Sequence, residues 1–289
     1  MKTKIISFVI IMILLVPTVS ALNTQQKDRQ SAKLITYNSV LQMSYDENAV
    51  NNAVFQPDGA PVSISLLVKF KVEIPEILLS NFILRILFLQ TFIITSAKIK
   101  LSVVNAPDWA TVSFSNPEVY ADISPEFAVA NTTMTIAVHS GAPSESYNLI
   151  IKAETDSLLH NHVPANDAEV NIVFQPNWTP FLEIFAPQST VQTPPDQITV
   201  IPINVTNCGN AQTKVSAQIN TSLEGWSTYI IPPQIILSTH ETQQMTLLLI
   251  PPVDFEGIKN IEILFNSSSL SGENGSLVPF TIMAYYNIR

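Results

Sequence analysis

Residues 198–219 alternate between apolar and polar side chains, and this period of two constrains the fold more than any other feature of the chain. Apolar residues stand at 201, 203 and 205, with Pro202 and polar residues between them, as in a strand that buries one face. The turn-forming run Asn207–Asn210 follows, and the apolar positions resume at Val215. The pattern predicts a β-hairpin with a long loop. The change of apolar parity beside Pro202 predicts a β-bulge there.

The same alternation recurs along much of the chain. Even positions from Val62 to Val72 are apolar, which predicts a long strand with one face on a core. Further strands are predicted at 97–104, 110–114, 133–138, 147–153, 168–174, 182–185, 228–231, 242–250, 258–265 and 277–285. Short strands separated by Pro, Asn, Asp and Ser favour an all-β fold of stacked sheets.

Two tryptophans mark a local plan that occurs twice. Trp109 follows one predicted strand and precedes another, and Trp226 has the same place later in the chain. Their wide separation suits tandem domains rather than a solenoid. The predicted organisation is a signal peptide at 1–21, a flexible lead-in at 22–48 with a candidate edge strand within 34–45, a first sandwich at 49–175, a linker at 176–180 and a second sandwich at 181–289.

The run Val205–Asn210, of the form V-x-N-x-G-N, resembles the Ig-like domains found beside α-galactosidases and in archaeal and bacterial surface proteins. Gly225-Trp226 and the later Pro251-Pro252 strengthen the resemblance, which extends to cell-adhesion-related bacterial sandwiches. It covers residues 181–289 well and reaches the first unit only through the Trp109 segment. It implies two tandem Ig-like or fibronectin-III-like β-sandwiches, as in exported archaeal surface proteins.

The first residues have the layout of a secretory signal peptide. Lys2 and Lys4 precede an apolar run from Ile5 to Val16, and Val19-Ser20-Ala21 supplies small residues for cleavage. The run is shorter than the ~20 residues of a membrane span, although retention as an uncleaved anchor is the alternative. An extracellular or envelope location is therefore predicted. On an exported chain, six Asn-x-Ser/Thr sequons are candidate N-glycosylation sites: Asn131, Asn177, Asn204, Asn220, Asn266 and Asn274.

Residues 74–94 depart from the strand pattern because they are apolar on nearly all sides. Their helical spacing predicts a helical insertion in the first sandwich. Three interpretations stay open: a helix packed over one end of the sandwich, a tip that enters a membrane or self-associates, and a transmembrane span, which Arg85 at its middle disfavours. The candidate membrane or partner contacts are Phe82, Leu87, Phe88 and Phe92.

The polar residues form no recognisable catalytic motif in the sequence, so we expect no enzyme, no cofactor and no metal site. His160 and His162 could share a strand face, but a polar loop is the simpler interpretation. Asp254 and Glu256 are better explained as a solvated loop than as a glycosidase pair. Cys208 is the single cysteine, which excludes an intrachain disulfide and leaves an intermolecular link or an incidental thiol.

The acidic balance limits the partners. The chain has 14 Lys and Arg against 23 Asp and Glu, and no basic stripe, which argues against nucleic acid. We expect an exported non-enzymatic surface or envelope protein, acting as a structural, adhesion or spacer module toward an unidentified protein or glycan. One alternative is a carbohydrate-binding accessory module, with Trp109 and Trp226 as sugar platforms rather than the core residues that we favour. Another is a membrane-contacting or self-assembling component that uses residues 74–94.

Overall fold

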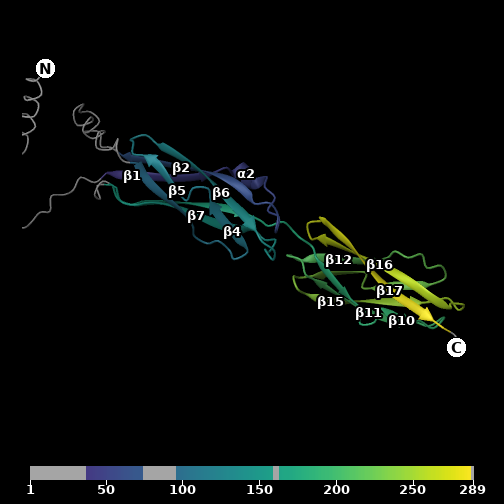
Figure 1. Cartoon of the computed structure of the whole chain (residues 1–289). Coiled ribbons are helices and arrows are strands. Elements are labelled where there is room, and N and C mark those ends of the chain that lie inside the picture. Colours follow the sequence, from purple (N-terminus) through teal and green to yellow (C-terminus); the bar gives the residue numbers. More distant parts are fainter. Residues whose placement is uncertain (1–36, 74–95, 159–162, 288–289) are drawn as a thin grey trace, which may run out of the picture. The chain divides into compact units, whose positions relative to one another are not determined.

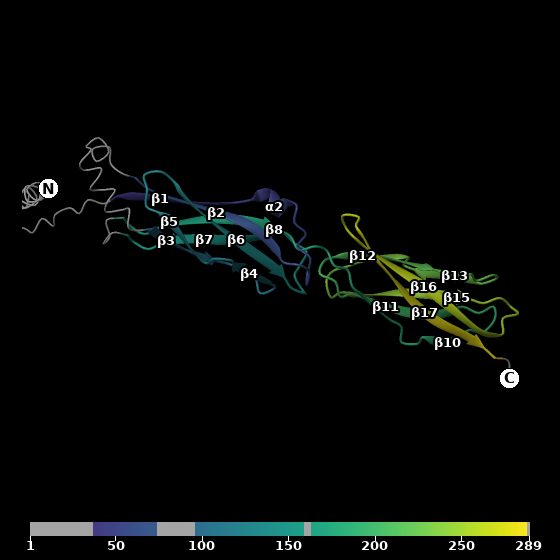
Figure 2. The same ribbon diagram turned by 45° about the horizontal axis from the view of Figure 1, so that its top comes forward.

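The computed structural model describes residues 37–73, 96–158 and 163–287, which form two β-sandwiches in succession along the chain (Figure 1). In each sandwich two sheets enclose buried apolar residues, which form one cluster in the second sandwich and two clusters in the first. Figure 2 shows the strands of each sandwich from a second direction. The all-β fold of tandem Ig-like sandwiches is therefore confirmed.

The first sandwich has two antiparallel sheets of four strands each. One sheet has the order β1 (Asn38–Tyr45), β2 (Val62–Glu73), β6 (Ala128–Val138) and β4 (Ala110–Phe114). The other has the order β5 (Glu118–Asp122), β3 (Ser96–Val103), β7 (Tyr147–Thr155) and β8 (Asn166–Phe174). A short helix, α2 (Glu47–Asn51), begins after Asp46, whose carboxylate accepts hydrogen bonds from the backbone amides of Asn48 and Ala49.

β2 shows how the alternating pattern builds the core. Its even positions from Ile64 to Val72 are at most 1% exposed, while Lys69 and Lys71 lie on the opposite face. Because successive side chains in a strand point to opposite faces, one run of sequence supplies both the core and the solvent face. The predicted orientation of this strand is confirmed.

The second sandwich has sheets of four and five strands. The smaller sheet has the order β13 (Ser227–Ile231), β15 (Thr242–Ile250), β11 (Thr199–Asn207) and β9 (Leu182–Phe185). The larger has the order β10 (Thr190–Gln192), β17 (Asn274–Tyr286), β16 (Gly257–Ser269), β12 (Thr213–Ile219) and β14 (Gln234–Leu237). Only the β10–β17 pair among them is parallel.

The predicted hairpin within 198–219 is wrong, because β11 and β12 lie in different sheets. β11 pairs with β15 and β9, whereas β12 pairs with β16 and β14. Val205 and Val215 still face one core, since the two sheets face each other and the chain crosses between them at 208–212. The turn signals were correct, but they mark a crossing between layers.

The predicted bulge beside Pro202 is also wrong. β11 pairs with β15 in continuous register from Thr199 to Thr206, so Val200 lies on the outer face and is 60% exposed. β9 pairs only with residues 204–207 of β11. The missing N–H of Pro202 therefore removes no hydrogen bond to β9.

Two further differences concern boundaries. β1 pairs with β2 along its whole length, so the first sandwich begins at Asn38 rather than at residue 49. The short strands β5, β10 and β14 were not predicted.

The signal peptide at 1–21 and the insertion at 74–94, with Phe82, Leu87, Phe88 and Phe92, lie outside the described residues. Within the described ranges, no helix is long and apolar enough to cross a membrane.

Candidate functional site

The V-x-N-x-G-N run forms the crossing between the sheets of the second sandwich, and its central asparagine is a structural residue. The side chain of Asn207 is fully buried. Its Nδ2 lies 2.8 Å from the Ala211 carbonyl oxygen, 3.1 Å from that of Leu237 and 3.2 Å from that of Ser238. Its Oδ1 accepts a 3.0 Å hydrogen bond from the Gly209 amide. This one amide therefore joins the end of β11, the crossing and the segment that follows β14.

The rest of the run holds the segment that enters the second sandwich. The Thr179 amide donates to Asn210 Oδ1 at 2.7 Å, and the Asn210 amide donates to the Thr179 carbonyl at 3.3 Å. The Cys208 amide donates to the Phe181 carbonyl at 2.8 Å. A Cβ on Gly209 would lie 2.8 Å from the Thr179 carbonyl oxygen, which is too close for any side chain at this position.

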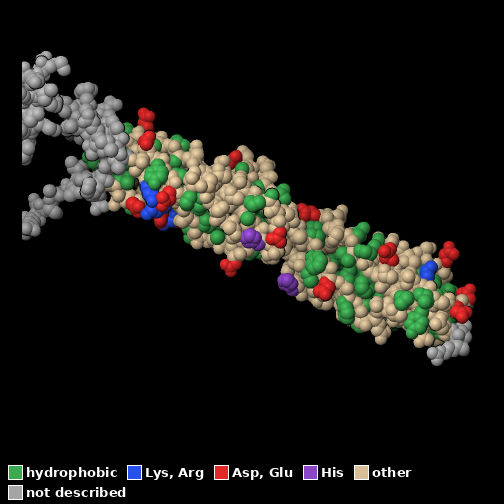
Figure 3. Space-filling model, viewed as in Figure 1, with side chains coloured by type: hydrophobic (Ala, Val, Ile, Leu, Met, Phe, Trp, Pro, Cys, Tyr) green, Lys and Arg blue, Asp and Glu red, His purple; other side chains and the backbone are tan. Residues whose placement is uncertain are grey.

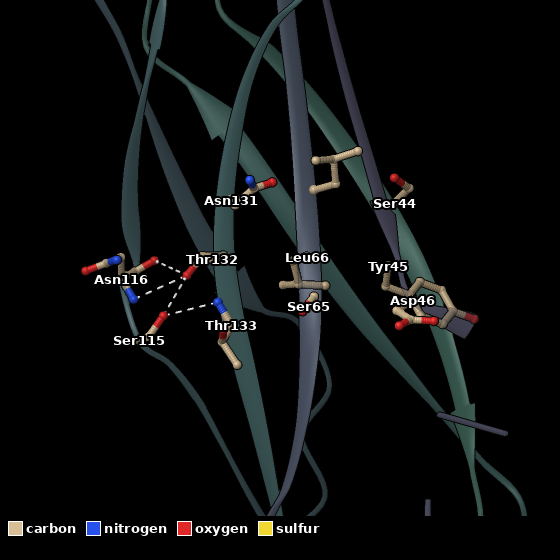
Figure 4. A pocket seen from close by; sticks show the side chains of 11 residues that line it. Ser44, Tyr45, Asp46, Ser65, Leu66, Ser115, Asn116, Asn131, Thr132 and Thr133 are labelled. Carbon is tan, nitrogen blue, oxygen red and sulfur yellow. Dashed lines mark hydrogen bonds between the residues drawn. The ribbon is translucent and has the colours of Figure 1, made fainter. Parts of the chain in front are cut away.

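A polar groove lies on the sheet β1-β2-β6-β4 of the first sandwich (Figure 4). Leu67 and Asn131 are direct cross-strand partners on its floor, and Ser44 lies opposite Leu67 on β1. The Thr132 hydroxyl donates to the Asn116 carbonyl at 3.1 Å, and the Thr132 side chain is only 5% exposed. The full lining is Ser44, Tyr45, Asp46, Ser65, Leu66, Leu67, Ser115, Asn116, Asn131, Thr132 and Thr133. Hydroxyl and amide groups of this kind suit hydrogen bonding to a polyhydroxylated ligand.

The sequence did not predict this groove, and of its lining residues only Asn131 was a candidate, as a sequon. Its lining comes from β1, β2, the end of β4 and β6, so it depends on the order of the strands in the sheet. The run Asn131-Thr132-Thr133 was visible as a sequon, but nothing local places Ser115 beside it. The Thr133 amide donates to Ser115 Oγ at 3.1 Å only because β4 pairs with β6.

Lysines and acids alternate on the outer face of the sheet β5-β3-β7-β8. Lys98 lies 2.7 Å from Glu118, and Lys152 lies 2.7 Å from Glu154. The hydrogen bond that each lysine donates to its carboxylate raises the pKa of that lysine, because it stabilises the charged ammonium. Lys100 is also paired, at 3.0 Å from Asp156. Figure 3 shows blue and red side chains together on the first sandwich, so these lysines do not present an unpaired basic surface to a polyanion.

Both repeated tryptophans pack against the cores, as the sequence favoured. Trp109 is half-buried, with its ring edge-on to Tyr147 at 5.4 Å and to Phe174 at 6.0 Å between centroids. Trp226 is half-buried beside Phe255 at 4.6 Å. Their contacts with the core clusters confirm the interpretation as core residues.

The six sequons fall into two structural groups. Three lie within strands, at Asn131 on β6, Asn204 on β11 and Asn266 on β16. The others lie at the connector, just after β12 and at the start of β17, and they are Asn177, Asn220 and Asn274.

The other sequence candidates give no assembled site in the part of the chain that the structure covers. Asp254 and Glu256 are exposed in the loop between β15 and β16. Cys208 is a free thiol of intermediate exposure. His160 and His162 lie outside the described residues. Among the described residues, no group of three or more His, Cys, Asp or Glu side chains is placed to hold a metal ion.

The chain is similar to several solved structures, all at low identity. The D00-D0 domain of intimin is 9% identical with a TM-score of 0.38, and the match covers 86% of this chain and 100% of that one. A protein of unknown function from Porphyromonas gingivalis W83 is 10% identical with a TM-score of 0.28, over 88% of this chain and 98% of that one. The collagen adhesin of S. aureus is 8% identical with a TM-score of 0.22, over 89% of this chain and 94% of that one. No family model and no curated protein matches the chain.

Proposed function

We propose that this chain is an exported, non-enzymatic protein of the cell surface or envelope, in which the two Ig-like sandwiches act as a structural, adhesion or spacer module. The observation that carries the proposal is the short connector at residues 176–180. At its start the Asn177 amide donates to the Phe55 carbonyl at 2.9 Å, and at its end Thr179 exchanges hydrogen bonds with Asn210. A short connector that is held at both ends suits a spacer, because it has less conformational freedom than a flexible linker.

The sequence supports the location and the class of partner. Residues 1–21 have the layout of a secretory signal peptide, and the second sandwich carries the V-x-N-x-G-N run that resembles Ig-like domains of exported surface proteins. The expected partner is a protein or a glycan outside the cell. The acidic composition, with a net charge of −9, disfavours nucleic acid.

The export of the chain can be tested on intact cells. The full chain, produced with its own N-terminus in its native cells, is expected to be digested by added protease, while a cytoplasmic marker stays protected. Amino-terminal sequencing should find a mature chain that begins just after Ala21. A chain that is protected until the cells are lysed, and that still begins at Met1, would contradict the proposal.

A carbohydrate-binding accessory module is the second candidate, and the groove of Figure 4 is the observation that favours it. Pull-down of the unglycosylated chain with insoluble polysaccharides separates the two functions. A purely structural or spacer role expects no retention. Retention that is lost in Asn131→Ala but kept in Asn260→Ala, an exposed asparagine on β16, would support the accessory module instead.

A further inference from the structure

Three sequons are presented by the outer faces of the sheets. Because side chains alternate along a strand, the asparagine of each sequon and the hydroxyl residue two positions later project from one face. The asparagines are Asn131, Asn204 and Asn266, and each is exposed or half-exposed. Their side-chain amides form no hydrogen bond with any other residue that the structure describes. All three amides are therefore free to be modified without loss of an internal contact.

Each of these asparagines lies directly opposite an apolar side chain on the neighbouring strand. Asn131 pairs with Leu67, Asn204 with Phe185, and Asn266 with Leu277. Phe185 is 59% exposed and Leu277 is 56% exposed. Cross-strand partners on one face are close enough for their side chains to contact each other. An attached group at Asn204 or Asn266 would therefore lie over exposed apolar surface, and one at Asn131 would lie over the half-buried Leu67.

The second sandwich has more apolar surface on these faces. Val200 is 60% exposed on β11, and Tyr229 is 58% exposed on β13; both are cross-strand partners of Leu248. Figure 3 shows hydrophobic side chains exposed over the second sandwich. Contiguous exposed apolar patches mark surfaces that another group contacts or covers.

The other three sequons are less suitable for glycosylation. Asn177 Nδ2 donates to Gln56 Oε1 at 3.4 Å, and Asn220 Nδ2 donates to Glu262 Oε2 at 2.5 Å. Glycosylation of either amide would replace one of its two protons and disturb these bonds. Asn274 is opposite Ser268, the hydroxyl residue of the Asn266 sequon, so glycans on Asn266 and Asn274 would compete for the same space.

We propose that Asn131, Asn204 and Asn266 carry N-linked glycans and that these glycans cover the apolar residues of the outer sheet faces. The donor is a polyprenyl-phosphate-linked oligosaccharide used by a membrane oligosaccharyltransferase. A bond forms between the asparagine Nδ2 and the anomeric carbon of the sugar, and the bond from that carbon to the phosphate oxygen breaks. The lipid phosphate leaves with the electron pair, and Nδ2 loses one proton.

The local chemistry fits a saccharide at each site. The C–H faces of a sugar can pack on the ring of Phe185 and on Leu277, as apolar groups do. Around Asn131, the hydroxyls of Ser44 and Ser65 line the groove and can bond to the first sugars. A bulky, solubilising group on a flat sheet face also hinders association between copies of the chain.

The first experiment measures the occupancy of the sites. The full chain is secreted from cells that have an N-linked oligosaccharyltransferase, and its glycopeptides are quantified by mass spectrometry. High occupancy is expected at the three strand sequons, and low occupancy at Asn177 and Asn220. Occupancy confined to those two sites, or an exported chain without any glycan, would overturn the inference.

This inference rests on the export that the proposed function includes, and the two can fail separately. An exported chain without glycans removes only the inference. A chain that stays inside the cell removes both. A free polysaccharide is the other source of the same chemistry, and it is distinguished because it leaves no mass on the asparagine after denaturation.

The second experiment tests whether the glycans cover apolar surface. The variant Asn131→Gln/Asn204→Gln/Asn266→Gln is compared with Asn177→Gln/Asn220→Gln as the control. The triple variant should bind an apolar fluorescent dye several-fold more strongly than wild type and should self-associate in light scattering, while keeping its circular dichroism spectrum. Dye binding equal to wild type in the folded triple variant would refute the covering role.

Discussion

Asn207→Ala removes the amide that holds the crossing between the sheets of the second sandwich. Nδ2 has two protons to share among three carbonyl oxygens, and Oδ1 accepts one bond from Gly209, so three hydrogen bonds are made at any moment. At about 1 kcal/mol for each bond, the direct loss is roughly 3 kcal/mol. The Leu237 carbonyl is left without this donor in a buried position, which adds to the loss.

The loss can be measured by calorimetry on the full chain. For a module of this size, ~3 kcal/mol corresponds to a fall of roughly 12 °C in the transition of the second sandwich, with the transition of the first unchanged. Asn260→Ala is the matched control, because Asn260 is an exposed asparagine in the same sandwich. This control should stay within about 0.5 kcal/mol of wild type.

A small effect would contradict this role of Asn207. If Asn207→Ala lowers the free energy of unfolding by less than about 1 kcal/mol, the buried amide does not hold the crossing. An equal loss in the first sandwich would also contradict it, since Asn207 packs only within the second.

Three further predictions concern other contacts. Gly209→Ala should lower the free energy of unfolding by about 1–3 kcal/mol in a thermal melt, because the new Cβ would lie 2.8 Å from the Thr179 carbonyl oxygen. An unchanged unfolding midpoint would show that the connector shifts to make room for the Cβ. Trp109→Ala should destabilise the first sandwich by about 3 kcal/mol in urea unfolding, and a variant as stable as wild type would contradict a core role. The hydrogen bond from Gln243 lowers the pKa of Glu241 below its ordinary value of 4.5. The ionised Glu241 therefore stabilises the fold above pH 4.5, and this stabilisation is lost as the pH falls through the lowered pKa. Stability of Glu241→Gln should therefore depend less on pH in that acidic window, and parallel curves for variant and wild type would exclude the effect.

The elements that sequence could predict were those with a long regular pattern. β2 alternates over many residues, and its buried face follows from the order of the side chains alone. β15 was predicted from its apolar run, in which only Met245, Leu247 and Leu249 are buried. β1 was recognised only as a candidate, because Leu41 is its one buried residue. β5, β10 and β14 have five, three and four residues, which is too short for a period to be recognised.

The error at β11 and β12 has a physical cause. A hairpin and a crossing between stacked sheets both need turn residues between two strands with inward apolar side chains. The difference lies in the partners, and those of β12 include β16, which is far along the chain. The run Asn207–Asn210 therefore indicated where the chain turns, but not which strands it joins.

For the candidate glycosylation sites, too, some features are local in the sequence and others depend on distant residues. The sequons are local strings, and the alternation of Ile203 and Val205 around Asn204 places its side chain on the outer face. Which amides are free depends on distant residues, such as Gln56 beside Asn177 and Glu262 beside Asn220.

By itself, the sequence determined the all-β class, the tandem plan and the buried face of the clearly alternating strand β2, because side-chain alternation is set by neighbours along the chain. Only the tertiary structure decided which strands pair and what lies across from each exposed asparagine. Strand pairing joins residues far apart in sequence, as in the register that places Leu67 opposite Asn131. The groove and the apolar neighbours of the sequons arise from such non-local pairs.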